Sequence, residues 1–214
     1  MLILGVDTAE RFGGVALFQE SAVSEERMME KPLEHAERLI PLIDEVVDAS
    51  GRNRSEIERI AVNLGPGSFT GLRIGLASAM GLCQALNVPL VGVGGCEAYR
   101  RRAEEARRVC VLIRSRRDLV YAQWFAGSKP RERIQLLHEA ELVDRLRGDA
   151  RELTLVGSAA EVIYEQVSDH PSLRLGEEEA RRPSALAVAR LGAVSEAADQ
   201  LSEIRPIYVE PILS

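Results

Sequence analysis

Cysteine is scarce in this sequence, which has three cysteines among 214 residues. Cys83, Cys96 and Cys110 lie far apart, and no two of them have the CxxC spacing of a zinc ribbon. Neither a disulfide framework nor a structural zinc site is therefore expected. A reducing compartment such as the cytoplasm suits the chain best.

An excess of basic residues is also missing. The 33 acidic side chains outnumber the 27 basic ones, which gives a net charge of −6 and an isoelectric point near 5.3. Proteins that bind nucleic acids unaided normally have a basic surface. Any role on RNA is therefore expected to depend on a partner.

No segment of the sequence is typical of a membrane span. The first seven residues, MLILGVD, have no basic segment and are too short for a signal peptide, so they predict a first strand. No charged residue lies between Ile74 and Cys96, but polar residues and glycines interrupt this stretch, which favours a buried helix followed by a buried strand. We therefore expect a cytoplasmic protein without membrane contact.

Short strands followed by helices make up the first half of the chain. Residues 2–6 and 13–18 predict a β-hairpin, and residues 21–29 could add a third antiparallel strand. Residues 33–49 repeat apolar side chains at helical spacing over more than one face, so this helix should meet its own sheet and a second neighbour. Residues 60–93 predict a strand, a glycine-rich loop, a helix and a strand, the order typical of a parallel strand pair.

A second pattern begins near residue 109. Its expected elements are a hairpin over 109–125, a strand over 153–156, a helix over 159–167 and a last helix from Pro183 to about Ala198. We therefore predict an α/β protein with an N-terminal lobe over 1–103 and a C-terminal lobe over 104–198. The segment from about 199 to 214 is expected to return to the N-terminal lobe.

The glycine-rich segment Gly65–Gly75, GPGSFTGLRIG, is the most distinctive part of the chain. Its glycines allow a tight turn after a strand, and Ser68 or Thr70 can cap the helix that follows. Such a turn could bind an anion at the helix start, but no lysine follows the glycines as in a Walker loop. The residues around Ser68 do not form a GxSxG nucleophile elbow either.

Small residues recur every four positions along this helix, at Gly71, Gly75 and Ala79. They form a shallow ridge that either the protein's own sheet or another helix can approach closely. The length and position of the helix favour an interface. On this interpretation, Gly75→Leu should abolish partner binding and leave the monomer folded.

The Gly65–Gly75 segment resembles the bacterial TsaB (YeaZ) family, relatives of the TsaD (Gcp) proteins of tRNA threonylcarbamoylation. Three further stretches match the family in the expected order, namely Val6-Asp7-Thr8, HAERLIP from His35 and RRDLVY from Arg116. The resemblance spans most of the chain and is strongest up to Tyr121.

Three positions depart from the family pattern. Arg114 and Ser115 stand where Asp-Ala is usual, and Glu210 stands where arginine is common. The arginines at 100–102 and 114–117 could contribute to a composite tRNA surface. Nearby carboxylates make solvated surface charge the simpler interpretation.

The resemblance implies the two-lobed fold of actin, Hsp70 and sugar kinases (ASKHA), with mixed sheets and flanking helices. In that fold an acidic residue of the first hairpin helps to place nucleotide phosphates and magnesium, and Asp7 and Thr8 stand at this place. The glycine expected between acid and threonine is missing, so we interpret the pair as a vestigial nucleotide site and expect no cofactor.

Metal-dependent catalysis is not expected either. The catalytic relatives carry an HxxxH pair on one helix, whereas the only histidines here are His35, His138 and His170, and none lies four residues from another. No catalytic residue is predicted.

The resemblance implies a non-catalytic scaffold or activator subunit that binds a TsaD-like catalytic subunit and enables threonylcarbamoyl transfer to the adenosine next to the tRNA anticodon. The other implied partners are a TsaE-like ATPase, a TsaC or Sua-type synthase in the same pathway, a second copy of the chain when it is alone, and tRNA through the complex only. The helices over 33–49 and 72–86 would form the interface. Its predicted residues are His35, Leu39, Ile43, Gly71, Leu72, Gly75, Ala79 and Leu82, next to a loop and helix start formed by Gly65, Gly67, Ser68, Thr70 and Arg73.

Two alternatives remain at this point. The first is an autonomous ATP-dependent phosphotransferase or ATPase that uses Asp7 and Thr8. The second is a peptidase of the glycoprotease type, although neither the serines nor the cysteines stand in a recognisable catalytic context.

Overall fold

The computed structural model describes residues 1–31, 34–198 and 200–210, and it divides into two compact units. Unit 1 comprises Met1–Ala98 and Pro183–Ile207, and unit 2 comprises Tyr99–Arg182 with the described residues from Tyr208. The predicted C-terminal lobe runs to residue 198, whereas the corresponding stretch of unit 2 ends at Arg182. Its last helix packs on the first sheet, because that sheet has a second apolar face to cover.

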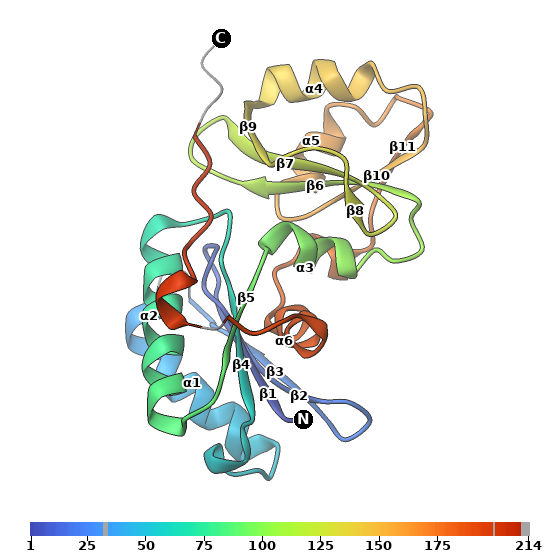
Figure 1. Cartoon of the computed structure of the whole chain (residues 1–214). Helices are drawn as coiled ribbons and strands as arrows, with labels where there is room; N and C mark the ends of the chain where they lie inside the picture. Colours follow the sequence, from blue (N-terminus) through green and yellow to red (C-terminus); the bar gives the residue numbers. More distant parts are fainter. Residues whose placement is uncertain (32–33, 199, 211–214) are drawn as a thin grey trace. The chain divides into compact units, whose positions relative to one another are not determined.

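Unit 1 contains a five-stranded mixed sheet (Figure 1). Its order is β3 (Val23–Met28), β2 (Gly14–Gln19), β1 (Ile3–Asp7), β4 (Arg59–Asn63) and β5 (Leu90–Val93). The first three strands are antiparallel neighbours, whereas β1, β4 and β5 are parallel. The predicted hairpin, third strand and parallel pair are all confirmed.

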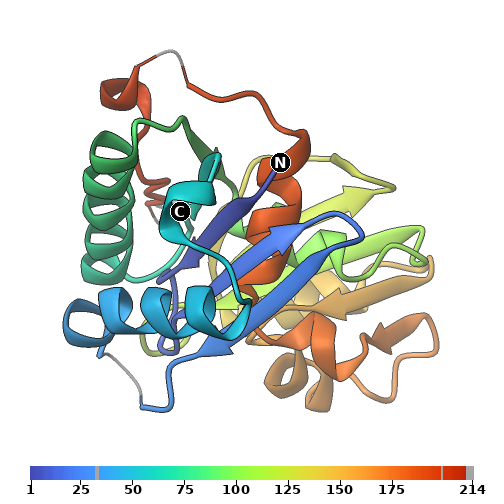
Figure 2. The same ribbon diagram turned by 90° about the horizontal axis from the view of Figure 1, so that it is seen from below.

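Helices cover both faces of this sheet. Helices α1 (His35–Ala49) and α2 (Phe69–Leu86) lie on one face and contact each other, and α6 (Ala185–Val194) lies on the other (Figure 2). Successive strand residues point to opposite faces, so Leu4 packs under α1 and α2 while Ile3 packs under α6. Unit 1 also contains α3 (Gly95–Arg101), which continues into unit 2, and the short 3₁₀ helices Arg54–Glu56 and Leu201–Glu203.

Helix α2 is long and apolar enough to cross a membrane by length and composition alone. The sequence predicts a buried helix here, but only 33% of its residues are buried. One side packs on the sheet of unit 1, and the other side is exposed.

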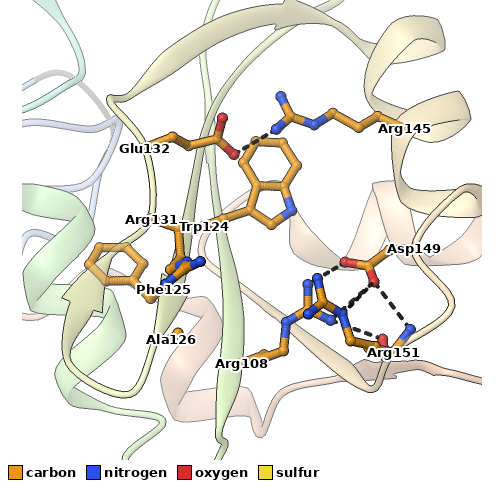
Figure 3. A pocket seen from close by; sticks show the side chains of 9 residues that line it. All are labelled: Arg108, Trp124, Phe125, Ala126, Arg131, Glu132, Arg145, Asp149 and Arg151. Atoms are coloured by element: carbon orange, nitrogen blue, oxygen red, sulfur yellow. Dashed lines mark hydrogen bonds and ion pairs between the residues drawn. The ribbon is translucent and has the colours of Figure 1, made fainter.

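Unit 2 contains a six-stranded sheet. Its order is β11 (Leu173–Leu175), β10 (Leu153–Val156), β6 (Arg108–Arg114), β7 (Leu119–Ala126) and β8 (Lys129–Pro130), with β9 (Gln135–His138) also paired to β7. The predicted hairpin is β6–β7. The helices are α4 (Glu139–Arg147), α5 (Ala160–Glu165) and the 3₁₀ turn Glu178–Arg181. Trp124 of β7 stacks against Arg145 of α4 at one end of this sheet (Figure 3).

Candidate functional site

The loop between β4 and α2 is fixed by hydrogen bonds at both ends. At its start, the Gly65 N–H donates to Asn63 Oδ1 at 2.8 Å. At its end, Ser68 is the N-cap of α2, and its hydroxyl accepts from the Gly71 N–H at 3.1 Å. Ser68 is therefore the capping residue that the sequence leaves open, while Thr70 is exposed inside the first turn.

The glycines of this segment lie against the loop between β1 and β2. A Cβ at Gly67 would be 2.0 Å from the Ala9 carbonyl oxygen, and one at Gly71 would be 2.1 Å from the Thr8 carbonyl oxygen. A Cβ at Gly75 would be 2.1 Å from Thr8 Oγ1. The close approach predicted for the small-residue ridge therefore occurs, but within unit 1.

Asp7 and Thr8 are enclosed by this packing. Asp7 is 2% exposed and its carboxylate accepts from the Ala9 N–H at 3.0 Å, while the fully buried Thr8 hydroxyl donates to the Gly71 carbonyl at 2.7 Å. Burial raises the pKa of Asp7, and hydrogen bonds from the Ala9 amide and the Asn63 side chain lower it.

These residues do not fit a magnesium–phosphate group. Asp7 is almost fully buried, its carboxylate already accepts the Ala9 N–H, and the Ala9 carbonyl accepts the Ser68 N–H at 2.6 Å. Within the described ranges no three His, Cys, Asp or Glu side chains gather into a cation site.

His35 joins α1 to the same loop. Its Nε2 lies 2.9 Å from the Glu10 carbonyl oxygen and its Nδ1 lies 3.3 Å from the sulfur of Met29. Burial lowers the pKa of this imidazole. The neutral ring, with Nε2–H as donor to Glu10, fits this environment and gives His35 a structural role.

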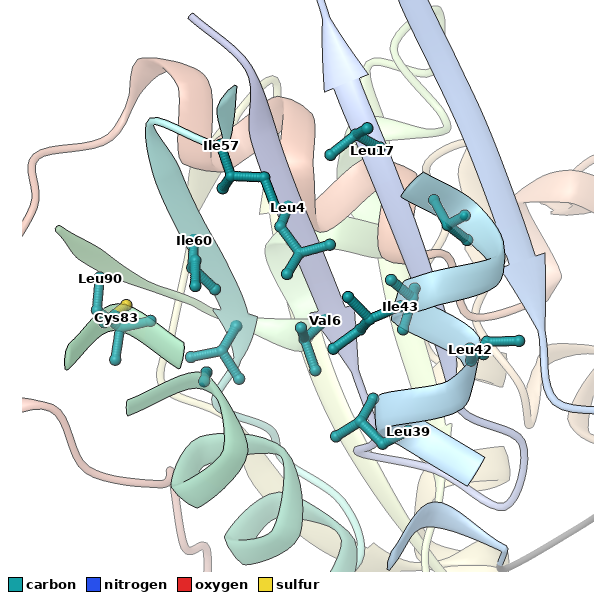
Figure 4. Packing of buried hydrophobic residues seen from close by; sticks show 14 of the residues in the cluster. Leu4, Val6, Leu17, Leu39, Leu42, Ile43, Ile57, Ile60, Cys83 and Leu90 are labelled. Atoms are coloured by element: carbon teal, nitrogen blue, oxygen red, sulfur yellow. The ribbon is translucent and has the colours of Figure 1, made fainter. Parts of the chain in front are cut away.

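Most of the predicted interface residues are buried inside unit 1. Leu39 and Ile43 pack with Leu4 and Val6 in its core (Figure 4). Leu82 alone of the eight is partly exposed, and the buried ones are His35, Leu39, Ile43, Gly71, Leu72, Gly75 and Ala79. In this conformation the chain's own sheet and hairpin loop cover these seven residues.

The opposite side of α2 is exposed and has an unusual composition. We define the outer face of α2 as Ile74, Ala77, Ser78, Gly81, Leu82, Gln84 and Ala85, which are exposed or half-buried. None of these side chains is charged. A Cβ added at Gly81 would meet nothing within 4 Å.

The edges of this face are also partly apolar. On α1, which packs against α2, Ile40 is 43% exposed. At the start of α2, Phe69 is 54% exposed and the Arg73 guanidinium lies 3.7 Å from the centre of its ring.

Several known proteins have sequences or structures similar to this chain. Residues 31–129 match the family model TsaD, described as tRNA N6-adenosine threonylcarbamoyltransferase. The Escherichia coli K12 "tRNA threonylcarbamoyladenosine biosynthesis protein TsaB" is 35% identical over 56% of this chain and 53% of its own length. The solved structure of YeaZ from Pseudomonas aeruginosa is 26% identical in sequence, its alignment covers 97% of this chain and 99% of that chain, and the TM-score is 0.78. By sequence and by structure, the chain is similar to proteins named TsaB or YeaZ.

The extent of these matches differs between relatives of the TsaB family. The chain spans about half the length of the E. coli and Haemophilus influenzae proteins, 53% and 56%. The Bacillus subtilis TsaB aligns over 93% of this chain and 90% of its own length, at 24% identity. The ROK hexokinase of Thermus thermophilus, 14% identical with a TM-score of 0.51, shares the fold alone. The predicted ASKHA fold is thereby confirmed.

The sequence pattern favours the ridge of Gly71, Gly75 and Ala79 as the interface, and it does not single out the outer face of α2. A signal for it is present. The absence of charge after Arg73 applies to both sides of the helix, although a helix that covers one sheet needs only one apolar side.

Proposed function

We propose that this chain is a non-catalytic subunit of the machinery that makes tRNA threonylcarbamoyladenosine. In this role it binds a TsaD-like catalytic subunit through the outer face of α2. Its E. coli and B. subtilis relatives are named as tRNA threonylcarbamoyladenosine biosynthesis proteins, which supports a role in this pathway. The match of residues 31–129 to the TsaD model supports a partner whose helices resemble α1 and α2.

The outer face of α2 is the observation that carries this proposal. A helix side exposed to water normally carries charged and polar side chains, whereas this one has no charged residue and, apart from Gln84, consists of small and apolar residues. The axes of packed helices usually lie about 8–10 Å apart, and small residues allow a distance near the lower limit. A second copy of the chain could cover the same face when the catalytic subunit is absent.

The enclosed hairpin supports the non-catalytic part of the proposal. The acid at the nucleotide position, Asp7, is bound to the Ala9 amide, and glycines of the α2 segment occupy the neighbouring space. The chain would therefore act by stabilising the active conformation of its partner. The TsaE-like ATPase and the TsaC-type synthase would supply the other steps.

Charge introduced on the outer face tests this interface. Ala77→Arg places a long cation on an exposed position of α2, and Ala140→Arg makes the same change on an exposed position of α4 in unit 2. Desolvating the new charge should weaken binding of the TsaD-like subunit by about tenfold or more, which is about 1.4 kcal/mol. Calorimetry with the purified partner measures this, and reconstituted tRNA modification should fall in parallel.

Two results would oppose the proposal. If the Ala77→Arg and Ala140→Arg variants bind the partner with equal affinity, the outer face of α2 is not part of the interface. If the partner proteins modify tRNA fully without this chain, the chain is not required in the pathway.

A further inference from the structure

A cavity of about 440 Å³ lies at one end of the sheet in unit 2 (Figure 3). All of its lining residues belong to that unit, so the cavity is independent of the outer face of α2. Its volume falls within the range of about 300–1,000 Å³ typical of small-molecule sites. The lining combines two aromatic residues with four arginines and two carboxylates.

Both carboxylates of the cavity already have partners. Asp149 accepts from the Arg108 guanidinium through both oxygens, one at 3.0 Å, and Glu132 accepts from Arg145 Nη2 at 2.6 Å. The pKa of Asp149 is lowered, and the hydrogen bond from Arg108 is the largest cause of this shift. The carboxylates therefore neutralise two of the four arginines.

The other two arginines keep their charge available. Arg151 lies 3.9 Å from Asp149, whose oxygens are already bound by Arg108, and its side chain is 79% exposed. Arg131 is exposed and has no carboxylate partner within the described part of the chain. The lining thus carries four positive and two negative charges, a net charge of +2, which suits an anion such as a phosphate.

Arg145 offers a fixed planar surface. Its guanidinium stacks 3.8 Å from the centre of the Trp124 ring, and Gln135 Oε1 and Glu132 Oε1 accept from it at 2.8 and 2.6 Å. Its side chain is nevertheless 41% exposed, so the face turned away from Trp124 is accessible. Nucleobases stack on arginine planes of this kind.

Trp124 adds an unused hydrogen-bond donor. The residue is 7% exposed, and no described residue accepts from its indole N–H. In Figure 3 the indole nitrogen lies on the side of the ring that faces Asp149. This N–H can donate to water or to a polar atom of a ligand in the cavity.

The negative charge of the whole chain does not argue against an anionic ligand in unit 2. Residues 99–182 and 208–214 contain 17 basic and 16 acidic side chains, a net charge of +1. The remaining residues contain 10 basic and 17 acidic ones, a net charge of −7. The overall −6 therefore comes from unit 1, and an anionic ligand is not repelled by unit 2.

We propose that this cavity binds a nucleotide. The phosphate is held by Arg131 and Arg151, and the base stacks on the accessible face of Arg145. A free mononucleotide and one residue of single-stranded RNA present the same chemistry. The site does not depend on the proposed partner function.

The cavity contains its own reporter, because Trp124 is the only tryptophan of the chain. The full chain is titrated with AMP, adenosine, inorganic phosphate and a short single-stranded oligoribonucleotide, with tryptophan fluorescence and calorimetry as parallel readouts. AMP should cause a saturable change, and adenosine should bind at least tenfold more weakly because it lacks the phosphate. The double variant Arg131→Ala, Arg151→Ala should raise the Kd for AMP tenfold or more.

Arg133 provides the matched control. It is exposed and lies two residues from Arg131, but it does not line the cavity, so Arg133→Ala should bind AMP as the unchanged chain does. An oligoribonucleotide that binds at least tenfold more tightly than AMP identifies RNA as the source of the ligand, and equal affinities identify the free nucleotide.

Two outcomes overturn the proposal. One is the absence of saturable binding of AMP and oligoribonucleotide in both readouts at millimolar concentration. The other is equal binding by the double variant and by Arg133→Ala. No partner subunit is present in this experiment, so its failure leaves the partner-binding proposal intact, and the reverse also holds.

Discussion

Replacing Gly75 by alanine should destabilise unit 1, although alanine is the better helix former by about 1 kcal/mol. The new Cβ would lie 2.1 Å from Thr8 Oγ1, far inside van der Waals contact. Relieving such overpacking costs about 1–3 kcal/mol. Displacing the Thr8 hydroxyl also weakens its 2.7 Å hydrogen bond to the Gly71 carbonyl, worth about 1 kcal/mol. The free energy of unfolding should therefore fall by about 1–3 kcal/mol.

The conflict at Gly75 involves one side chain, so a double-mutant cycle can isolate it. Thr8→Ala removes the hydroxyl, and the next nearest atom, Thr8 Cβ, lies 3.4 Å from the added carbon. In the Thr8→Ala background, Gly75→Ala should therefore stabilise the chain by about 1 kcal/mol through helix propensity alone. The coupling energy between the two positions is then about 2–4 kcal/mol.

Urea unfolding followed by far-ultraviolet circular dichroism measures these free energies. Gly81→Ala is the control, because Gly81 lies in the same helix with open space around its Cβ position, and it should stabilise by about 0.5–1 kcal/mol. The reasoning is refuted if Gly75→Ala stabilises as Gly81→Ala does, or if its effect is the same with and without Thr8. Leucine is larger still, so the expectation that Gly75→Leu leaves the monomer folded does not agree with this geometry.

Two further predictions concern contacts within unit 1. Glu26 of β3 accepts from the Ser184 hydroxyl and the Leu186 N–H, both at 2.9 Å, at the start of α6, so Glu26→Ala should lower the unfolding free energy by about 1–2 kcal/mol. An unchanged urea midpoint would show that this contact contributes nothing. The pKa of His35 is lowered below 6.5 in the folded state, so the stability gained from its neutral form is complete above that pH and is lost as the pH falls towards the folded-state pKa. Unfolding at about pH 7.5 and 5.5 should show this loss in the unchanged chain and a smaller one in His35→Gln, and equal losses would contradict the assignment.

Local patterns in the sequence are sufficient to predict much of unit 1. The β1–β2 hairpin and the β4–α2–β5 unit follow from strand periodicity and from the turn at Gly65, and the structure contains both. The Ser68 cap is a local interaction between neighbours in sequence. Such features depend on residues a few positions apart, which a sequence displays directly.

The orientation of α2 could not be predicted in the same way. After Arg73 both of its sides are uncharged and contain small residues, so composition does not distinguish the side that meets the sheet from the side that faces solvent. The orientation of α2 depends on the contact between Gly75 and Thr8, which lie 67 positions apart in sequence. The Trp124 cavity also combines β6, β7 and α4 with their adjoining loops, and no local spacing links Arg108 to Arg145.

Unit 1 is built from two stretches of chain that are far apart in sequence. Ile3, Ala61 and Val91 form one face of its sheet, and α6 covers that face only after unit 2 has been traversed. During synthesis on a ribosome, all residues of unit 2 up to Arg182 emerge before α6 does, so unit 2 can complete its core first while this face of the earlier sheet stays open. A chain stopped at residue 182 should therefore bind apolar dyes and chaperones through that uncovered face, although every strand of the first sheet has already been made.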